Sequence, residues 1–181
     1  LGTMNNQTFT YDEAQTLNDN HFTRDGYTFV GWNTQSDGNG TTYNTTTEYS
    51  NLTTSESITL YAMWEANKYT ILFNYNTTDS IEEEVANMEA TYDVTTNLPT
   101  VVPTRVSHDF VGWADNADGI GKIYEPGDEV KNLAYKGEIT LYAVWEIKTY
   151  EITFIVKDIE NKITYNYGES LTSDKFESFT E

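Results

Sequence analysis

The most persistent pattern in the chain is the alternation of apolar and polar side chains, with a period of two residues. Residues 69–75 read Tyr-Thr-Ile-Leu-Phe-Asn-Tyr, with a large apolar or aromatic side chain at every second position, and residues 150–156 repeat this pattern. Successive side chains of a strand point to opposite faces, so the pattern predicts strands with one buried face. Further strands are predicted over 27–32 and 58–64, and another is expected to end at Tyr11, Tyr92 and Tyr167.

One segment of each repeat departs from this period. Asp12 is followed by Glu-Ala-Gln-Thr-Leu, which predicts one or two helical turns capped by Asp12 that place Leu17 against the sheet. Thr95, Thr96 and Pro99 disfavour a longer helix at the equivalent place in the second copy. Each copy is therefore expected to contain one short helix at most.

The chain repeats itself at a fixed distance. Gly31-Trp32 recurs as Gly112-Trp113, and the segment Leu60–Trp64 recurs as Leu141–Trp145, each 81 residues later. Residues 1–65 align with 82–146 without a gap, so a duplication explains the similarity better than chance. The repeat predicts three modules: module 1 at 1–65, whose first strand is missing, the complete module 2 at 69–145, and the start of module 3 at 150–181.

The residues shared by both copies are predicted to have structural roles. The tryptophans could stack on sugars, but their positions in strands favour packing in a core or on a sheet. The glycine before Trp32 and Trp113 predicts a bulge or close packing. The shared signature is Phe29, Gly31, Trp32, Asp37, Gly38, Gly40, Leu60, Tyr61, Ala62 and Trp64, repeated as Phe110, Gly112, Trp113, Asp118, Gly119, Gly121, Leu141, Tyr142, Ala143 and Trp145.

Composition narrows the classes of function. The chain has 29 acidic and 10 basic residues, a formal net charge of −19 and no cysteine. Nucleic acid and anionic membrane surfaces would repel such a chain, and disulfides and thiolate zinc sites are excluded. No apolar run is long enough to span a membrane, so membrane insertion is not expected.

No metal, cofactor or catalytic site is predicted. The Asp-Gly-x-Gly segments at 37–40 and 118–121 are explained by turns, in which glycine supplies a positive φ. An EF-hand counted from Asp115 would place Pro126 where a bidentate glutamate is required. His21 and His108 are not equivalent in the repeat, so no catalytic arrangement recurs between modules.

The shared motifs resemble a known family. Gly-Tyr-Thr-Phe-Val-Gly-Trp at 26–32, Asp-Gly-Asn-Gly at 37–40 and Thr-Leu-Tyr-Ala-Met-Trp at 59–64 are similar to the Listeria–Bacteroides repeat, the B-repeat type of internalin-like surface proteins. The resemblance implies an α+β, mostly β fold of tandem β-grasp-like modules, each with about four strands and one short helix. It also implies a bacterial extracellular location, at the cell surface or in the cell wall.

Three functions are consistent with these features. The leading interpretation is a non-catalytic stalk or spacer that contacts neighbouring repeat modules and serves adhesion or protein interaction. The first alternative is a module that binds a glycan or a host or bacterial surface protein through exposed aromatics or a sheet edge. The second is a non-catalytic appendage of a secreted enzyme. Exposed aromatics on every module would favour binding, whereas buried tryptophans would favour a spacer.

The incomplete modules lead to two competing hypotheses. Residues 150–156, with a hairpin partner at 162–167 across 158–161, could complete module 1 of a neighbouring chain and so give head-to-tail self-association. Alternatively, the folded unit is permuted, and residues 58–64 form a hairpin with 69–75 across the four-residue junction Glu65–Lys68. Neither junction is a flexible tether, so limited movement between modules is expected.

Overall fold

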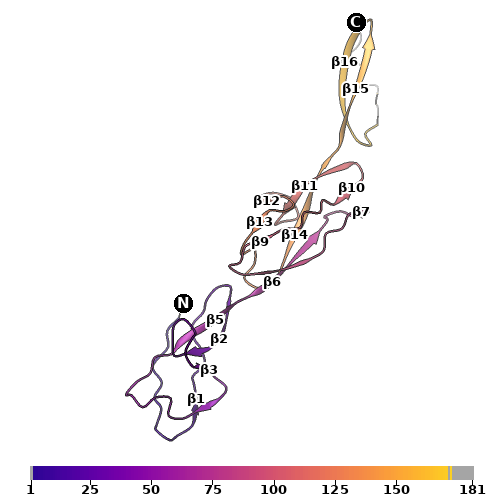
Figure 1. Cartoon of the computed structure of the whole chain (residues 1–181). Helices are drawn as coiled ribbons and strands as arrows, with labels where there is room; N and C mark the ends of the chain where they lie inside the picture. Colours follow the sequence, from indigo (N-terminus) through magenta and orange to yellow (C-terminus); the bar gives the residue numbers. More distant parts are fainter. Residues whose placement is uncertain (1, 171, 173–181) are drawn as a thin grey trace. The chain divides into compact units, whose positions relative to one another are not determined.

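The computed structural model describes residues 2–170 and 172, with the side chain of residue 156 left out. The described residues form two compact units. The first combines residues from Leu1–Thr70, Glu89–Thr96 and Val130–Glu138, and the second combines residues from Ile71–Met88, Asn97–Glu129 and Ile139–Glu181. All regular structure in the described part is strand (Figure 1). It contains no helix that could span a membrane. The end of the predicted module 3 lies outside the described residues.

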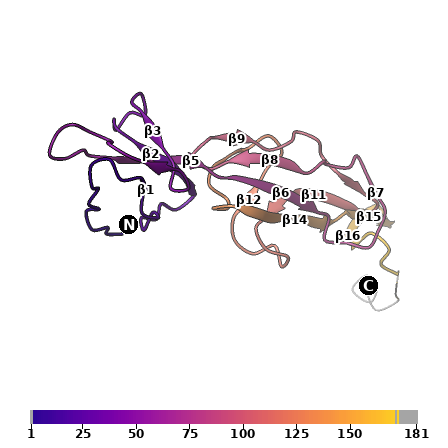
Figure 2. The same cartoon turned by 90° about the horizontal axis from the view of Figure 1, so that it is seen from below.

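Module 1 contains a small antiparallel sheet in the order β3-β2-β5 (Figure 2). The long pair is β2 (Tyr27–Asn33) with β5 (Tyr61–Ala66), and the pairing slips between Phe29 and Gly31. A separate two-stranded sheet joins residues far apart in the module. The short strands are β1 (Gln15–Thr16), β3 (Thr42–Tyr43) and β4 (Glu48–Tyr49), with β1 paired to β4.

Module 2 contains a seven-stranded sheet in the order β7-β10-β11-β14-β6-β8, with β12 also paired to β11. The first strand of the module, β6, therefore lies between β14 and β8. Two further short strands, β9 and β13, pair with each other. The bounds are β6 (Lys68–Asn74), β7 (Ile81–Glu82), β8 (Met88–Thr91), β9 (Thr96–Asn97), β10 (Thr104–Arg105), β11 (His108–Ala114), β12 (Ile123–Tyr124), β13 (Glu129–Val130) and β14 (Gly137–Ile147).

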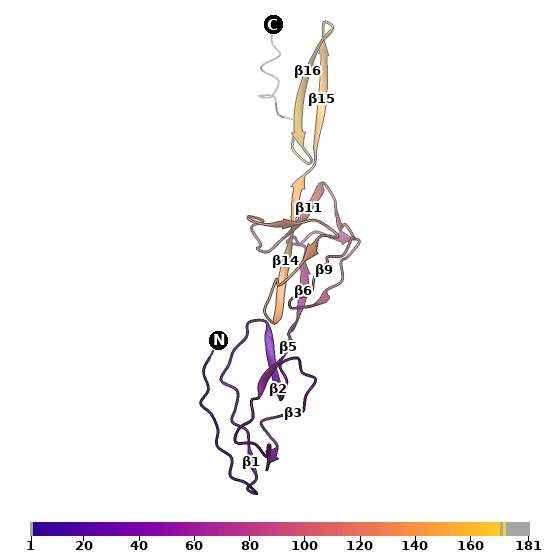
Figure 3. The ribbon, with the colours of Figure 1, turned by 60° about the vertical axis from the view of Figure 1, so that its left-hand side comes forward.

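The described part of module 3 is a hairpin of β15 (Thr149–Val156) and β16 (Ile159–Asn166) (Figure 3). Register pairs run without interruption from Thr149–Asn166 to Val156–Ile159. Lys157 and Asp158 form the turn with φ of 50° and 65°, the left-handed geometry of tight hairpins. The hairpin therefore turns one residue earlier than the predicted loop at 158–161, and its second strand is longer than 162–167.

The predicted helix is absent from the described residues, so the α+β, β-grasp-like expectation was wrong and the fold is all-β. Asp12 and Asp93 have φ of 64° and 62°, whereas a helix-capping residue has β-region angles. The chain that follows forms the short strands β1 and β9. Leu17 and Leu98 are buried at 7% and 2% exposure without any helical turn.

The hairpin that a permuted unit requires is not formed in residues 2–170. β5 pairs with β2, whereas β6 lies between β14 and β8, so the two strands flanking the Glu65–Lys68 junction belong to different sheets. The permuted alternative is therefore wrong for the described structure.

Candidate functional site: the repeated module junction

The junction between modules 1 and 2 is held by two backbone hydrogen bonds. Asn67, which separates β5 from β6, donates its N–H to the carbonyl of Gly26 at 2.8 Å. Its own carbonyl accepts the N–H of Tyr92 at 2.8 Å. All three residues belong to the first compact unit. One linker residue is therefore bonded both to module 1 and to module 2.

The same pair of hydrogen bonds recurs between modules 2 and 3. Lys148 donates its N–H to the Ser107 carbonyl at 2.8 Å and accepts the N–H of Tyr167 at 2.8 Å. Ser107 and Lys148 stand 81 residues after Gly26 and Asn67. Because only backbone groups take part, the arrangement survives the change from asparagine to lysine at the linker position. No residue type is therefore required at the linker position, and the residue pattern does not predict the contact.

A side-chain clamp supports one turn in module 1 and one in module 2, and the clamp of module 2 lies next to the first junction. Asp93 accepts a hydrogen bond from the Asn132 amide at 2.9 Å, and Asn132 Oδ1 accepts the Asp93 N–H at 2.6 Å. In module 1, Asp12 and Asn51 make the same reciprocal pair at 2.8 Å and 2.8 Å. All four residues have positive φ, between 52° and 64°, which asparagine and aspartate tolerate better than most residues.

Aromatic and polar side chains pack around the first junction. The Tyr27 and Tyr92 rings meet edge to face with centroids 5.8 Å apart, and Tyr27 donates its hydroxyl to Asp93 at 2.7 Å. That hydrogen bond raises the pKa of Tyr27, while the hydrogen bonds from Asn132 and Tyr27 lower the pKa of Asp93. Asn67 also donates its side-chain amide to the Tyr135 carbonyl at 3.0 Å. Module 1 and module 2 thus contribute side chains to the same contact.

The second junction has different side chains at the equivalent positions. His108 stands where module 1 has Tyr27, and its Nδ1 lies 3.1 Å from the Val106 carbonyl. Lys148 instead forms an ion pair with Asp109 at 3.5 Å. The backbone pair is therefore common to both junctions, while the side-chain contacts are specific to each.

Replacing Asn132 tests the clamp. Asn132→Ala should lower the free energy of unfolding of the chain by about 1–2 kcal/mol, because it removes the reciprocal hydrogen bonds and puts alanine at positive φ. Asn132→Gly keeps the backbone geometry and should cost less. Denaturant titration compares the two variants. Equal losses would mean that the hydrogen bonds to Asp93 account for the whole effect, and no loss in Asn132→Gly would mean that they contribute nothing.

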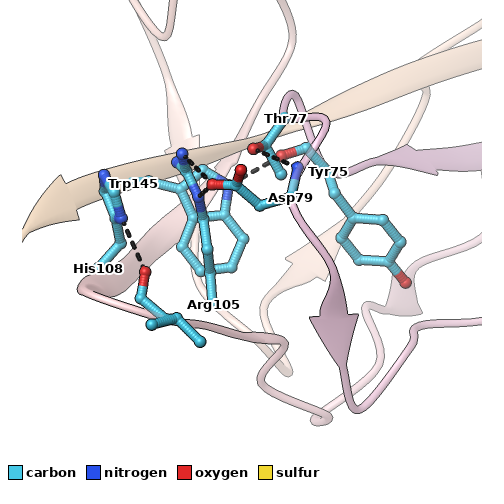
Figure 4. Close-up of polar contacts among 7 residues, drawn as sticks. Tyr75, Thr77, Asp79, Arg105, His108 and Trp145 are labelled. Carbon is cyan, nitrogen blue, oxygen red and sulfur yellow. Dashed lines mark hydrogen bonds and ion pairs between the residues drawn. The ribbon is translucent and has the colours of Figure 1, made fainter.

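A second polar cluster ties β6 to the rest of module 2 (Figure 4). Arg105 donates Nε–H to Asp79 at 2.8 Å, and its guanidinium also forms an ion pair with the same carboxylate oxygen at 2.7 Å. The guanidinium carbon lies 5.8 Å from the Trp145 ring centroid. Trp145 donates its indole N–H to the Tyr75 carbonyl at 2.8 Å. The loop after β6 is thereby bonded to β10 and β14.

These aspartates make stability depend on pH in acid. The hydrogen bond from Arg105 lowers the pKa of Asp79, as those from Asn132 and Tyr27 do for Asp93. A carboxyl group whose pKa is lower in the folded state stabilises the fold above its unfolded pKa of about 4, and this contribution is lost as the pH falls through the folded value. The melting temperature should therefore fall below about pH 4.

A matched pair of variants isolates the Asp79 contribution. Asp79→Asn should lower the melting temperature at neutral pH and weaken its decline in acid. Glu84→Gln removes the same charge from the exposed run at 82–84 and should leave the acid decline as it is. Thermal unfolding across the pH range measures both, and identical profiles would rule out the Arg105–Asp79 pair as a source of the dependence.

The structure places the strand residues of the shared signature in, or next to, equivalent strands of modules 1 and 2. Gly31 and Gly112 have φ of 150° and 155° and lie at the slip in pairing of β2 and β11. A side chain there would approach the carbonyl of Tyr43 or Tyr124 to 2.9 Å or 2.8 Å. Trp32 and Trp113 are buried. The strand partners Phe29, Leu60, Tyr61, Ala62, Trp64, Phe110, Leu141, Tyr142, Ala143 and Trp145 lie on β2, β5, β11 and β14 or next to them.

The Asp-Gly segments at 37–40 and 118–121 form turns held by hydrogen bonds within each segment. Asp37 accepts the N–H of Asn39 at 3.0 Å, and Asp118 accepts the N–H of Ile120 at 3.2 Å. Gly38 and Gly119 have φ of 80° and 70°, while Gly40 and Gly121 end the turns. Within residues 2–170 no group of three His, Cys, Asp or Glu could hold a metal ion.

Calcium should therefore change stability little. Both turn aspartates already accept backbone N–H groups, and the hydrogen bonds from Asn39 lower the pKa of Asp37 without a cation. Calorimetry with chelator and with low-millimolar calcium should give nearly the same melting temperature. A rise of many degrees in calcium would contradict this prediction.

The sequence prediction missed the junction and clamp residues. For the clamp a signal was present, because Asp12 and Asp93 are identical at the repeat distance, as are Asn51 and Asn132. The local sequence instead predicts a helix cap at Asp12. Asn33 was also missed: it is fully buried, and its amide donates to the Gly38 and Gly40 carbonyls at 3.1 Å and 3.2 Å.

Comparisons with known proteins agree with this repeat organisation. The family profile of the Listeria-Bacteroides repeat domain matches residues 2–63 and 69–144. A protein of Evansella cellulosilytica described as a Gly-rich membrane protein is 37% identical over 74% of this chain and 16% of its own length. Internalin H of Listeria monocytogenes is 34% identical over 67% of this chain and 19% of its own length. The chain thus spans less than a fifth of these relatives, and no solved structure matches it.

Proposed function

Since this chain belongs to the Listeria-Bacteroides repeat domain family, we propose that it is a non-catalytic spacer segment of a bacterial surface or secreted protein. Each module is bonded to the next through the same backbone pair. The recurrence of the Gly26–Asn67–Tyr92 contacts at Ser107, Lys148 and Tyr167 is the observation that carries the proposal. A contact repeated at every junction is what an array of coupled modules requires.

The tryptophans favour a spacer over a ligand-binding module. Trp32 and Trp113 are 7% and 0% exposed, so neither ring can offer a face to a sugar. The half-buried Trp145 uses its indole N–H within module 2. The exposed tyrosines do not recur as a set, because Tyr61 is 42% exposed while its equivalent Tyr142 is half-buried. Among the described residues, no aromatic platform is therefore repeated on the modules.

An extracellular location is supported by the relatives and the charge. Internalin H and the Gly-rich membrane protein are similar to this chain over 67% and 74% of its length. The formal charge of −19 keeps such modules soluble and mutually repelling at a crowded surface. Adhesion would then depend on other parts of the longer protein, which the modules hold away from their attachment.

Distance measurements between modules test the spacer function. The chain has no cysteine, so spin labels at Thr54→Cys in module 1 and Glu125→Cys in module 2 are unique. If the modules are coupled, double electron–electron resonance should give one narrow distribution of the distance between the two labels. A pair within module 1, Thr54→Cys with Val30→Cys, supplies the reference width. The distance distribution between labels on either side of the junction should be about as narrow as this reference.

Two results would argue against the proposal. A broad distribution across the junction, with a narrow one inside module 1, would mean that the modules move independently. Binding to a glycan panel that Tyr61→Ala abolishes would favour the ligand-binding alternative instead.

A further inference from the structure

The turn that joins β2 to β3 in module 1, the β2–β3 turn, is organised around one buried amide. Asn33 is fully buried, and its Oδ1 accepts the backbone N–H groups of Gln35 and Gly40 at 2.8 Å and 3.1 Å. Its Nδ2 donates to the carbonyls of Gly38 and Gly40 at 3.1 Å and 3.2 Å. Both polar atoms of the Asn33 side chain therefore hold the backbone of this turn in place.

Close packing requires glycine at position 40. A β-carbon there would overlap Thr34 Oγ1 and would lie 2.7 Å from Asn33 Oδ1. A larger residue would therefore have to displace the buried amide. The residue before this glycine is Asn39, the only asparagine of the chain that glycine follows. The packing of the turn thus fixes a glycine directly after an exposed asparagine.

An asparagine followed by glycine can react with its own backbone. The backbone nitrogen of Gly40 attacks Cγ of Asn39, so that a C–N bond forms and the Cγ–Nδ2 bond breaks. The amide proton of Gly40 leaves with Nδ2 as ammonia, and a five-membered succinimide ring remains. Water then opens the ring at one of its two carbonyls and gives aspartate or isoaspartate. Glycine favours ring formation because it has no side chain to hinder the approach and its backbone is permissive.

The folded turn engages both reacting groups in other contacts. The Gly40 N–H is donated to Asn33, and Asn39 donates its side-chain Nδ2–H to Asp37 Oδ2 at 3.0 Å. Asp37 also accepts the backbone N–H of Asn39 at 3.0 Å. These hydrogen bonds lower the pKa of the Asp37 carboxyl group, which is therefore ionised at neutral pH and has no proton to give to departing ammonia. The reaction at Asn39 thus requires that the turn open first.

Module 2 has an equivalent turn without the reactive pair. Ile120 stands where module 1 has Asn39, and glycine is retained after it at position 121. The N–H of Ile120 donates to Asn116 Oδ1 at 3.1 Å, so another asparagine closes this turn. Asn116 is followed by alanine, which hinders ring formation. The reactive sequence is therefore a property of module 1 and not of the repeat.

We propose that Asn39 is a site of spontaneous deamidation, and that the opening of the β2–β3 turn sets its rate. The product carries one more negative charge, and isoaspartate also adds one carbon to the backbone before Gly40. The extra carbon moves the Gly40 N–H away from Asn33, whose buried oxygen then loses a hydrogen bond. Module 1 therefore loses stability with age, while module 2 keeps its turn. The reaction needs only the turn and does not depend on the spacer function.

Peptide mapping by mass spectrometry during incubation at mildly alkaline pH follows the reaction. In denaturant, Asn39 should deamidate faster than any other asparagine of the chain. In the native chain its deamidation should be slower by at least the protection factor of the Gly40 amide in hydrogen exchange, because both processes require that this N–H leave Asn33. Asn39→Ile introduces the residue of module 2 and should abolish the mass change in this peptide.

A matched pair of variants tests the role of the buried amide. Asn33→Ala should speed native deamidation of Asn39 by about tenfold, because opening the turn no longer breaks the Asn33 hydrogen bonds. Asn44→Ala is the control: Asn44 Oδ1 accepts the N–H groups of Thr46 and Thr47 at 3.0 Å and 2.8 Å, outside the β2–β3 turn, and its loss should leave the rate unchanged. The comparison of native and denatured wild-type chain holds even if Asn33→Ala unfolds module 1. Equal rates in the native and denatured wild-type chain, equal effects of the two variants, or faster deamidation of another asparagine in denaturant would overturn the proposal.

Discussion

Trp113→Ala should unfold module 2 under conditions in which the unaltered chain remains folded. The side chain is 0% exposed, and its ring lies 4.8 Å from Phe73, 5.1 Å from Phe110 and 6.0 Å from Tyr75. Truncating a large buried aromatic typically lowers the free energy of unfolding by about 3–5 kcal/mol, from lost burial and the cavity left behind. These rings come from β6, β11 and the loop after β6, so the loss should affect the whole sheet.

Denaturant titration with site-resolved hydrogen exchange measures this effect. Exchange of the β6, β11 and β14 amides should accelerate together, while the β2–β5 pair of module 1 should change little. Trp113→Phe is the conservative control: it retains an aromatic ring and removes an indole N–H that has no hydrogen-bond partner among the described residues. Trp113→Phe should lower the free energy of unfolding much less than Trp113→Ala does. A loss of less than about 1 kcal/mol for Trp113→Ala would mean that the ring does not hold the core together.

Gly26→Ala should disrupt the first module junction. A β-carbon at this position would overlap the ring of Tyr92, and Gly26 has a φ of 76°, which costs alanine about 1–2 kcal/mol. Overpacking of a well-filled contact adds about 1–3 kcal/mol. The Tyr92 ring must therefore move, and with it the backbone N–H that bonds to Asn67.

A matched glycine separates the clash from the backbone strain. Gly137 has a φ of 78° in the same compact unit, and a β-carbon there would meet nothing within 4 Å. Gly137→Ala should therefore lose only the unfolding free energy that the backbone strain costs. Exchange at the Asn67 and Tyr92 amides should accelerate in Gly26→Ala and not in Gly137→Ala. Equal losses of unfolding free energy, with both junction amides still protected, would show that the Gly26–Tyr92 contact contributes nothing.

The second junction tolerates a side chain at the equivalent place. Ser107 has a φ of 68° and still accepts the Lys148 N–H, while Tyr167 is 55% exposed. The requirement for glycine at position 26 thus comes from the packed Tyr92 ring rather than from the backbone pair.

Local sequence determined the repeat, the longer strands and the family. Strand periodicity at 69–75 and 150–156 depends on which side chains face a core, and this information lies within a few residues. The same holds for the turns at Asp37-Gly38 and Asp118-Gly119, where glycine and a self-bonding aspartate act together. The bulge glycines before Trp32 and Trp113 were also recognisable, because a strand seldom keeps glycine without a geometric reason.

Tertiary structure decided what depends on partners distant in sequence. Asp12 has the local chemistry of a helix cap, but Asn51, 39 residues away, bonds to it and holds a left-handed turn in place of the helix. The junction is made by backbone groups, which every residue carries, so no residue type could reveal it. Leu141 is fully buried because β6, which is distant from it in sequence, lies beside β14. Sequence sets which surfaces a strand offers, and only the assembled sheet decides which of them are covered.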